Sequence, residues 1–168
     1  TLTSLIEAEI GRLEEEFSAR ARTRILRHAQ SVRRSLDALA TTLLRTEKPL
    51  AYEDLMGALT DAGVDGTLRD EMVELFEDYG ILCTRETPAE RPLAAPETLY
   101  SPGSRHLWDY FMAIRLIDED HVPAPIVSSH PDMAEMYAIL LVEKDGTVPQ
   151  ECPDLAQAVG ERRAHMLS

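Results

Sequence analysis

Residues 67–84, TLRDEMVELFEDYGILCT, are the stretch that determines the fold of this chain. A helix is predicted over residues 67–79, because Leu68, Met72, Leu75 and Phe76 recur at helical spacing and form one apolar face. Thr67 is expected to cap this helix, and Gly80 to end it, since glycine readily adopts left-handed backbone angles. Residues 81–84 then predict a β-strand that follows the helix directly.

The sequence on both sides of this stretch completes a recognisable order of elements. Upstream, Leu50 and Ala51 predict a very short strand, residues 52–62 a helix with Leu55, Met56 and Leu59 inward, and residues 63–66 a turn. Downstream, residues 85–96 carry three prolines and predict a loop, and residues 97–100 predict the returning strand. The predicted order is that of a winged helix, a helix-turn-helix followed by a β-hairpin: helix, short strand, helix, turn, helix, strand, loop, strand.

Longer helices are predicted outside this core. Before it, residues 2–20 form one amphipathic helix, opened by a Ser4–Glu7 capping box, and residues 22–46 form a second helix that ends before Lys48-Pro49. After it, Ser104 caps an apolar helix to Asp118, Pro131 opens another that ends at Asp145, and residues 154–164 form a last helix. The fold class is therefore mainly α, a winged helix flanked by long N-terminal helices and C-terminal helical hairpins. The expected division is 1–46, 47–103 and 104–168.

Composition narrows the class of protein. The 168 residues include 44% hydrophobic ones but only 5% aromatics, which suits a core built from helices packed on helices. Thirty acidic residues against seventeen basic ones give a formal net charge of −13, which disfavours binding to nucleic acid or to an anionic membrane. Cys83 and Cys152 form no cysteine framework, and no signal or membrane-spanning run is present, which favours the cytoplasm.

The helix at 67–79 would be the DNA-reading helix of a winged helix, and its charge argues against that use. It carries Arg69 as its one basic residue against five acidic ones, Asp70, Glu71, Glu74, Glu77 and Asp78. A helix in the major groove lies between two rows of phosphates, so four net negative charges would cost affinity. We expect Asp70, Glu74 and Glu77 to form a surface that binds protein.

One basic cluster stands out against this acidic background. Arg24, Arg27 and Arg34 fall close to one face of the predicted second helix. They form a candidate interaction surface for an acidic neighbour. The alternative is a solvated face that pairs with Glu14, Glu15 and Glu16 of the preceding helix, and such charge runs are usually solvated.

No catalytic or metal-binding motif is present. The five histidines include no pair three or four residues apart on one helix, and no HExxH, GxSxG or glycine-rich phosphate loop occurs. We expect no enzymatic activity and no cofactor or metal in this chain.

Residues 36–119 resemble a segment of a known family. The strings KPLAYEDL (48–55) and VELFEDYGIL (73–82), followed by LWDYFMA (107–113), are similar to the winged helix and following helical region of STAND signalling ATPases, the NACHT and NOD-like group. In that family a histidine six residues before the tyrosine of the last string often senses bound nucleotide. Ser104 holds that position here and His106 lies two residues later, so the resemblance implies a nucleotide-sensing role for His106, with Ser104 beside it.

The resemblance also implies a larger protein around this chain. Thr1 is the first residue and no methionine precedes it, so we interpret the chain as a piece of a longer protein. An ATPase core that binds ATP or ADP and magnesium would precede it, and a sensor of helical repeats would follow. The winged helix would be a regulatory joint that docks on the core in one state and moves away in another, with oligomerisation and a role in antiviral defence implied.

Two other functions stay open from the sequence. One is a dimeric winged-helix transcription regulator, in which helices 2–46 form the dimer interface and residues 67–79 approach DNA. The other is a stand-alone helical adaptor in a larger complex.

Overall fold

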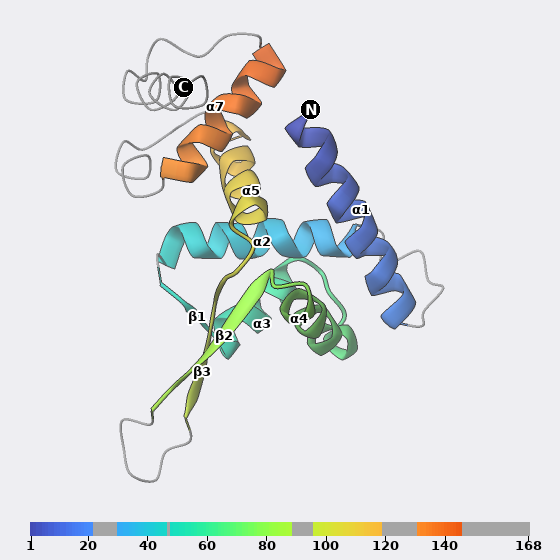
Figure 1. Cartoon of the computed structure of the whole chain (residues 1–168). Helices are drawn as coiled ribbons and strands as arrows, with labels where there is room; N and C mark the ends of the chain where they lie inside the picture. Colours follow the sequence, from blue (N-terminus) through green and yellow to red (C-terminus); the bar gives the residue numbers. More distant parts are fainter. Residues whose placement is uncertain (22–29, 47, 89–95, 119–130, 146–168) are drawn as a thin grey trace. The chain divides into compact units, whose positions relative to one another are not determined.

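The computed structural model describes residues 1–21, 30–46, 48–88, 96–118 and 131–145 (Figure 1). The chain divides into two compact units, Thr1–Trp108 and Asp109–Ser168, and the boundary falls inside helix α5 (Arg105–Asp118). The described part is mainly helical with one small three-stranded antiparallel sheet. The expected three-part division at residues 46 and 103 stays a prediction.

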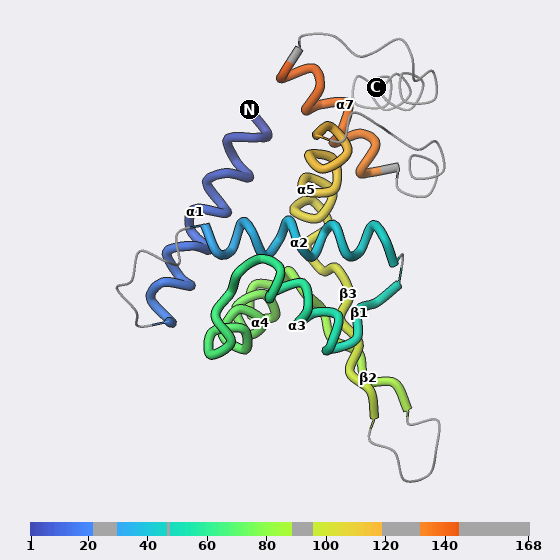
Figure 2. The backbone as a smooth tube through the Cα atoms, turned by 180° about the vertical axis from the view of Figure 1, so that it is seen from behind, coloured from blue at the N-terminus to red at the C-terminus, as the bar shows by residue number. Residues whose placement is uncertain are grey.

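The first unit contains the sheet and most of the helices. Its elements are α1 (Leu2–Arg20), α2 (Ser31–Thr46), β1 (Leu50–Ala51), α3 (Tyr52–Asp61), the 3-10 turn η2 (Gly66–Leu68), α4 (Arg69–Asp78), β2 (Leu82–Thr87), β3 (Glu97–Pro102) and the start of α5 (Arg105–Asp118). Helix α2 packs against both α1 and α3, and α1 also contacts α4. Seen from behind, β1 leads directly into α3 beside β3 (Figure 2).

The predicted strands are present and pair with one another. The strand order is β1-β3-β2, with Leu50 opposite Tyr100 on one edge of β3 and Thr84 opposite the same tyrosine on the other. The predicted loop at 85–96 is wrong at its start, because β2 continues to Thr87. Each added residue gains a partner on β3, and the Thr87 hydroxyl donates to the Glu97 carbonyl at 3.0 Å. Residues 89–95 lie outside the described part.

Helices α3 and α4 end in the same type of turn. Gly63 and Gly80 have φ angles of 76° and 65°, in the left-handed region that favours glycine. After each glycine an apolar residue donates its N–H five residues back, Val64 to the Leu59 carbonyl at 3.0 Å and Ile81 to the Phe76 carbonyl at 2.7 Å. This is a Schellman motif, which satisfies the free carbonyls of the last helical turn. The prediction that Gly80 ends the helix is confirmed.

Two predicted helix caps are wrong for one physical reason. Asp65, not Thr67, accepts the first free N–H at the start of η2, with its Oδ1 2.9 Å from the Thr67 nitrogen. Thr1, not Ser4, does so at α1, with its Oγ1 3.1 Å from the Ser4 nitrogen. In both cases the predicted cap residue supplies the N–H, and an oxygen-bearing side chain two or three residues earlier accepts its hydrogen bond. The extent of α1 was predicted correctly.

The second long helix is shorter than its apolar spacing predicts. It begins at Ser31, and Gln30 has a φ of 63°, which a right-handed helix does not contain. The expected continuous helix over 22–46 is therefore wrong at Gln30, and residues 22–29 lie outside the described part. The expected inner face from Val32 to Leu43 is confirmed by the burial of Val32, Leu36, Leu39 and Leu43.

The start of α5 is fixed to the turn that ends α4. The Ile81 carbonyl accepts two hydrogen bonds, from the Gly103 nitrogen at 2.9 Å and from the indole Nε1 of the buried Trp108 at 2.8 Å. A Cβ atom on Gly103 would lie only 2.2 Å from the Gly80 carbonyl oxygen, so only glycine fits this approach. The close contact holds β2, β3 and α5 together at one point.

The second unit comprises the rest of α5 and α7 (Pro131–Asp145). The predicted extents of both helices are confirmed. Tyr110 and Phe111 meet edge to face, with ring centroids 5.5 Å apart, and Met133 and Leu141 are among the buried residues of α7. None of the described helices is long and apolar enough to cross a membrane. The helix predicted at 154–164 lies outside the described residues.

Candidate functional site

Ser104 and His106, both predicted site residues, lie together just before and at the start of α5. The Ser104 hydroxyl is 3.1 Å from His106 Nδ1, and His106 Nε2 is 2.9 Å from a carboxylate oxygen of Glu9 on α1. The three groups are partly exposed, with 52% of the histidine side chain accessible to solvent. They form a continuous hydrogen-bonded chain that joins α1 to the start of α5.

The neutral imidazole satisfies both partners in one tautomer. With the proton on Nε2, His106 donates to Glu9 and accepts from the serine hydroxyl. Both ring nitrogens are then occupied, so a nucleotide phosphate would have to displace Ser104 or Glu9 to reach the histidine. Glu9 was not predicted, because its relation to His106 spans 97 positions.

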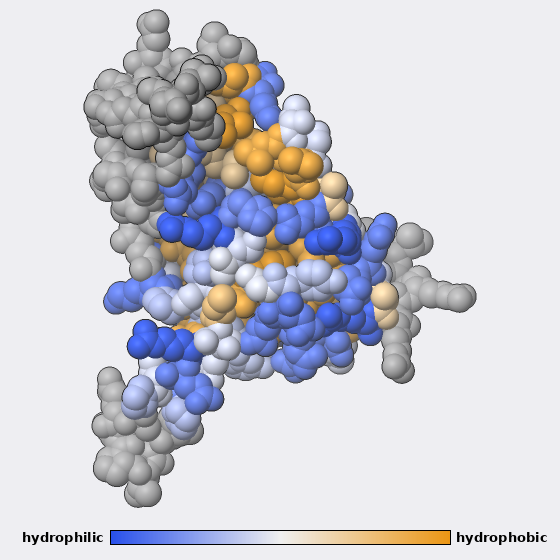
Figure 3. All heavy atoms as spheres, in the orientation of Figure 1, coloured by the Kyte–Doolittle hydropathy of each residue, from blue (hydrophilic) through white to orange (hydrophobic). Residues whose placement is uncertain are grey.

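The outward face of α4 carries the three predicted acidic residues. Asp70, Glu74 and Glu77 are all exposed, and Figure 3 shows hydrophilic residues over this surface. Asp70 accepts a hydrogen bond from the Tyr52 hydroxyl at 3.1 Å. The only basic residue of α4, Arg69, turns back and donates to the Val64 carbonyl at 3.2 Å. The face is therefore acidic without a cation of its own to offset it.

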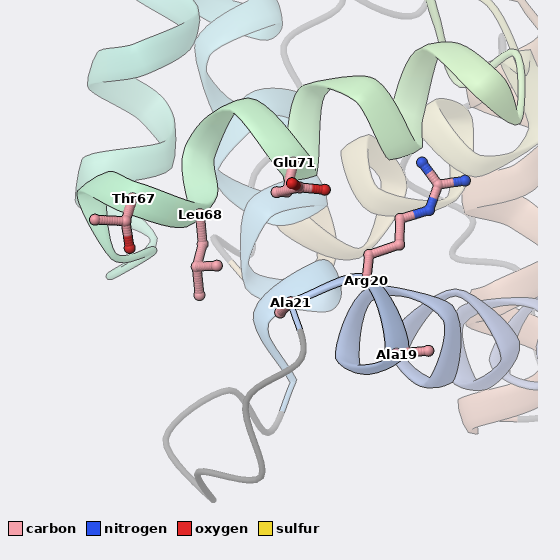
Figure 4. A pocket seen from close by; sticks show the side chains of 6 residues that line it. All are labelled: Ala19, Arg20, Ala21, Thr67, Leu68 and Glu71. Atoms are coloured by element: carbon pink, nitrogen blue, oxygen red, sulfur yellow. The ribbon is translucent and has the colours of Figure 1, made fainter.

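A hollow of about 710 Å³ lies between the end of α1 and the start of α4. Figure 4 shows the six residues that line it: Ala19, Arg20, Ala21, Thr67, Leu68 and Glu71. Arg20 is already engaged, because it donates to Asp78 at 2.7 Å and to Glu16 at 3.1 Å. The hydrogen bond to Asp78, followed by that to Glu16, raises the pKa of Arg20. Arg20 therefore links α1 to α4 through its ion pair with Asp78, and its guanidinium is already occupied by two carboxylates.

A second hollow, of about 460 Å³, lies beside the sheet and is called the tyrosine hollow below. It is lined by Ala51, Tyr52, Glu53, Glu97, Thr98 and Tyr100. Tyr100 is 8% exposed, and burial, together with the negative charge of Glu77, raises the pKa of its hydroxyl. The hydrogen bond to Asp70 raises the pKa of Tyr52. Glu53 and Glu97 line this hollow, and the negative charges of Asp70 and Glu77 act on its two tyrosines.

The predicted arginine surface stays a prediction, because only Arg34 of its three residues lies in the described part of the chain. Arg24 and Arg27 lie outside it. Arg34 is exposed on α2, with its Nη1 3.7 Å from the position that a Cβ on Gly63 would occupy. Its neighbour Arg33 instead pairs with Glu7 of α1 and donates its backbone N–H to Glu14 at 3.0 Å.

Other site chemistries find no support in the described ranges. No group of three or more His, Cys, Asp or Glu side chains there could hold a metal ion, and Cys83 is an exposed free cysteine. Comparison with protein-family models, curated proteins and solved structures found no match for the chain.

The tyrosine hollow was missed by the sequence argument. Its residues come from β1, the start of α3 and β3, and no local spacing relates Tyr52 to Tyr100. The signal that could have found it is the pairing of the Leu50–Ala51 strand with the returning strand. That antiparallel pair places Leu50 opposite Tyr100, which brings Tyr52, two residues further along the chain, to the same hollow as Tyr100.

Proposed function

We propose that this chain is a regulatory, protein-binding module without catalysis of its own, part of a larger nucleotide-dependent signalling protein. In it a winged helix couples an ATPase core to a sensor region. One observation supports the proposal most: the helix that would read DNA in a winged helix presents an exposed acidic face, Asp70, Glu74 and Glu77.

The order and pairing of the elements support the winged-helix assignment. Helix α2 is followed by β1, the α3–α4 pair and two strands that pair antiparallel. The short β1 joins the open edge of β3, which gives the strand order β1-β3-β2. In a winged helix α4 would be the recognition helix and β2–β3 the wing.

The charges of α4 favour a protein partner over DNA. Its single cation is held by the Val64 carbonyl, and among the described residues Asp78 is the one carboxylate of the helix that pairs with an arginine, Arg20. The remaining carboxylates would meet the phosphate rows of a duplex without compensation. A basic protein surface, such as that of an ATPase core, would be complementary to them.

The resemblance to STAND ATPases supports the place of this module in a larger switch. A switch of this kind needs contacts that differ between its two states. The contact of His106 with Glu9 is a candidate, because a bound nucleotide that takes a hydrogen bond of His106 would release α1 from the start of α5. A cytoplasmic location, oligomerisation and a role in defence belong to the same proposal.

The test combines DNA binding with the genetic context. Titration of the 168-residue chain into a fluorescent 20-base-pair duplex should give no saturable binding below about 10⁻⁴ M at physiological salt, the weak end of ordinary non-specific binding. The reading frame upstream of Thr1 should contain a GxxxxGK[ST] phosphate loop. Tight binding of duplex with a steep salt dependence would instead establish the transcription regulator. An upstream frame without a phosphate loop would exclude the ATPase assignment.

A further inference from the structure

The tyrosine hollow exists because β1 stops early. Leu50 and Ala51 pair with Tyr100 and Leu99, but the chain turns into α3 at Tyr52. On the edge of β3 that faces away from β2, Thr98 and Glu97 therefore have no strand beside them in the described chain. Tyr52 and Glu53, the first residues of α3, diverge from that edge, and the space between becomes the hollow.

The carboxylates around this hollow are not neutralised. Glu53 and Glu97 line it, and Asp70 and Glu77 lie close enough to Tyr52 and Tyr100 to raise the pKa of one or both hydroxyls. Within the described ranges, none of these four carboxylates pairs with a lysine or arginine. Negative charges around a hollow attract a cation that enters it.

Tyr100 supplies an independent observation at the same place. Its side chain is 8% exposed and lines the hollow, yet its hydroxyl makes no hydrogen bond to any residue that the structure describes. Buried polar groups without a partner are rare, because each costs free energy that a hydrogen bond would recover. A donor that enters the hollow would supply the missing partner.

We propose that the tyrosine hollow binds the side chain of an arginine or lysine from a basic, extended segment of a partner protein. The cation would enter beside Glu53, donate to the Tyr100 hydroxyl and contact the ring of Tyr52, which is 48% exposed, while the charge of Glu97 attracts it from the edge of β3. Carboxylates and tyrosine rings are the groups that hold such cations, the first by charge-assisted hydrogen bonds and the second by cation–π attraction. The inference rests on the proposed function only in taking the partner to be a protein.

The experiment uses the whole chain and a defined probe. A fluorescein-labelled peptide of alternating glycine and arginine is titrated against the protein by anisotropy, and the citrulline version of the same peptide serves as the neutral control. The arginine peptide should bind and the citrulline peptide should not. In ¹⁵N–¹H spectra the amides of Ala51, Tyr52, Thr98 and Tyr100 should shift together.

Two variants separate this site from general attraction to an acidic protein. Glu53→Gln with Glu97→Gln removes two charges at the hollow, and Glu15→Gln with Asp61→Asn removes two exposed charges elsewhere. The first pair should weaken binding about tenfold or more, and the second by less than about twofold, since long-range attraction between exposed charges is screened by salt. Tyr100→Phe should weaken binding about threefold to tenfold without lowering the melting temperature, because the lost hydroxyl has no partner in the fold.

The outcomes distinguish this inference from the proposed function. Equal losses for the two pairs of variants, or amide shifts spread over the whole acidic surface, would overturn the hollow as a specific site. Neither result would alter the measurement on duplex DNA, which tests the proposed function separately. A lysine peptide that binds as tightly as the arginine peptide would support the same site for both cations.

Discussion

The two faces of α4 differ in every physical respect although they share ten residues. The inward face places Met72, Val73, Leu75 and Phe76 in the core, and Leu75 and Phe76 are 0% exposed. The outward face presents Asp70, Glu74 and Glu77 to solvent. One face is fixed by packing. The other makes few contacts within the chain, so its composition is free to serve binding.

The difference teaches where to look for function in this fold. A buried apolar face is explained by the free energy of folding, and any well-packed set of similar volume would serve. On an exposed face charges of one sign repel one another, and Asp70 is the residue of this face that gains a stabilising contact in the described chain, the hydrogen bond from Tyr52. A protein partner that binds this face, as proposed above, would account for its charge.

The largest effect is expected from the inward face. Phe76→Ala removes a fully buried ring from the contact of α4 with the core, and should lower the free energy of unfolding by about 3–5 kcal/mol. Urea denaturation followed by circular dichroism measures the loss. A loss below about 1 kcal/mol would show that this face does not hold α4 in place.

The turn at the end of α4 should show the next largest effect. Gly80→Ala forces a left-handed φ of 65° on a residue with a Cβ, and should cost about 1–2 kcal/mol. Gly57→Ala is the matched control, because Gly57 lies inside α3 with open space around its Cβ position. That control should gain about 0.5–1 kcal/mol from the better helix propensity of alanine. Equal effects at the two glycines would contradict the left-handed turn.

Alkaline pH tests the tyrosine hollow through stability. The pKa of Tyr100 is raised in the folded protein by burial first and by Glu77 next, so the folded state retains this proton to a higher pH than the unfolded chain does. Stability is therefore fully present below the ordinary tyrosine pKa of about 10 and is lost as the pH rises through the higher folded value. Thermal melts between neutral pH and about pH 11 should show this decline, and Tyr100→Phe should reduce it. An unchanged decline in the variant would assign it to other groups.

The smallest effect is expected from the outward face. Glu74→Gln with Glu77→Gln should change the free energy of unfolding by less than about 0.5 kcal/mol per residue, with a slight gain at low salt from reduced repulsion. Denaturation at low and at physiological salt measures both. A clear loss of stability would mean that these carboxylates support the fold, which would remove the argument that they are kept for a partner.

Most of the helices and strands could be predicted from local sequence. Helix α1, the strand at Leu50–Ala51, the stop at Gly80 and the extents of α5 and α7 all follow from apolar spacing, glycine and proline. The predictions that were wrong concern helix ends, where single residues decide the structure and the spacing of apolar residues gives no information. Asp65 captures the Thr67 nitrogen before Thr67 can act as a cap, and Gln30 adopts a left-handed angle where the apolar repeat would continue a helix.

Of the candidate sites, one could be predicted from local sequence, and the others could not. The acidic face of α4 is visible in residues 67–79 alone, because helical periodicity places Asp70, Glu74 and Glu77 together. The link between Glu9 and His106 and the meeting of Tyr52 with Tyr100 depend on residues that are far apart in the chain.

The sequence by itself determined most of the described helices, the existence of the three strands, the acidic helix face and the net charge of −13, since each depends on neighbours along the chain or on composition. Only the tertiary structure decided that β1 pairs with β3, that Gly103 closes on Gly80, and that a hollow opens between α3 and β3. Those features arise from strand register and backbone approach. Strand register and backbone approach both bring together residues that are distant in the chain, so the periodicity of a single helix or strand cannot predict them.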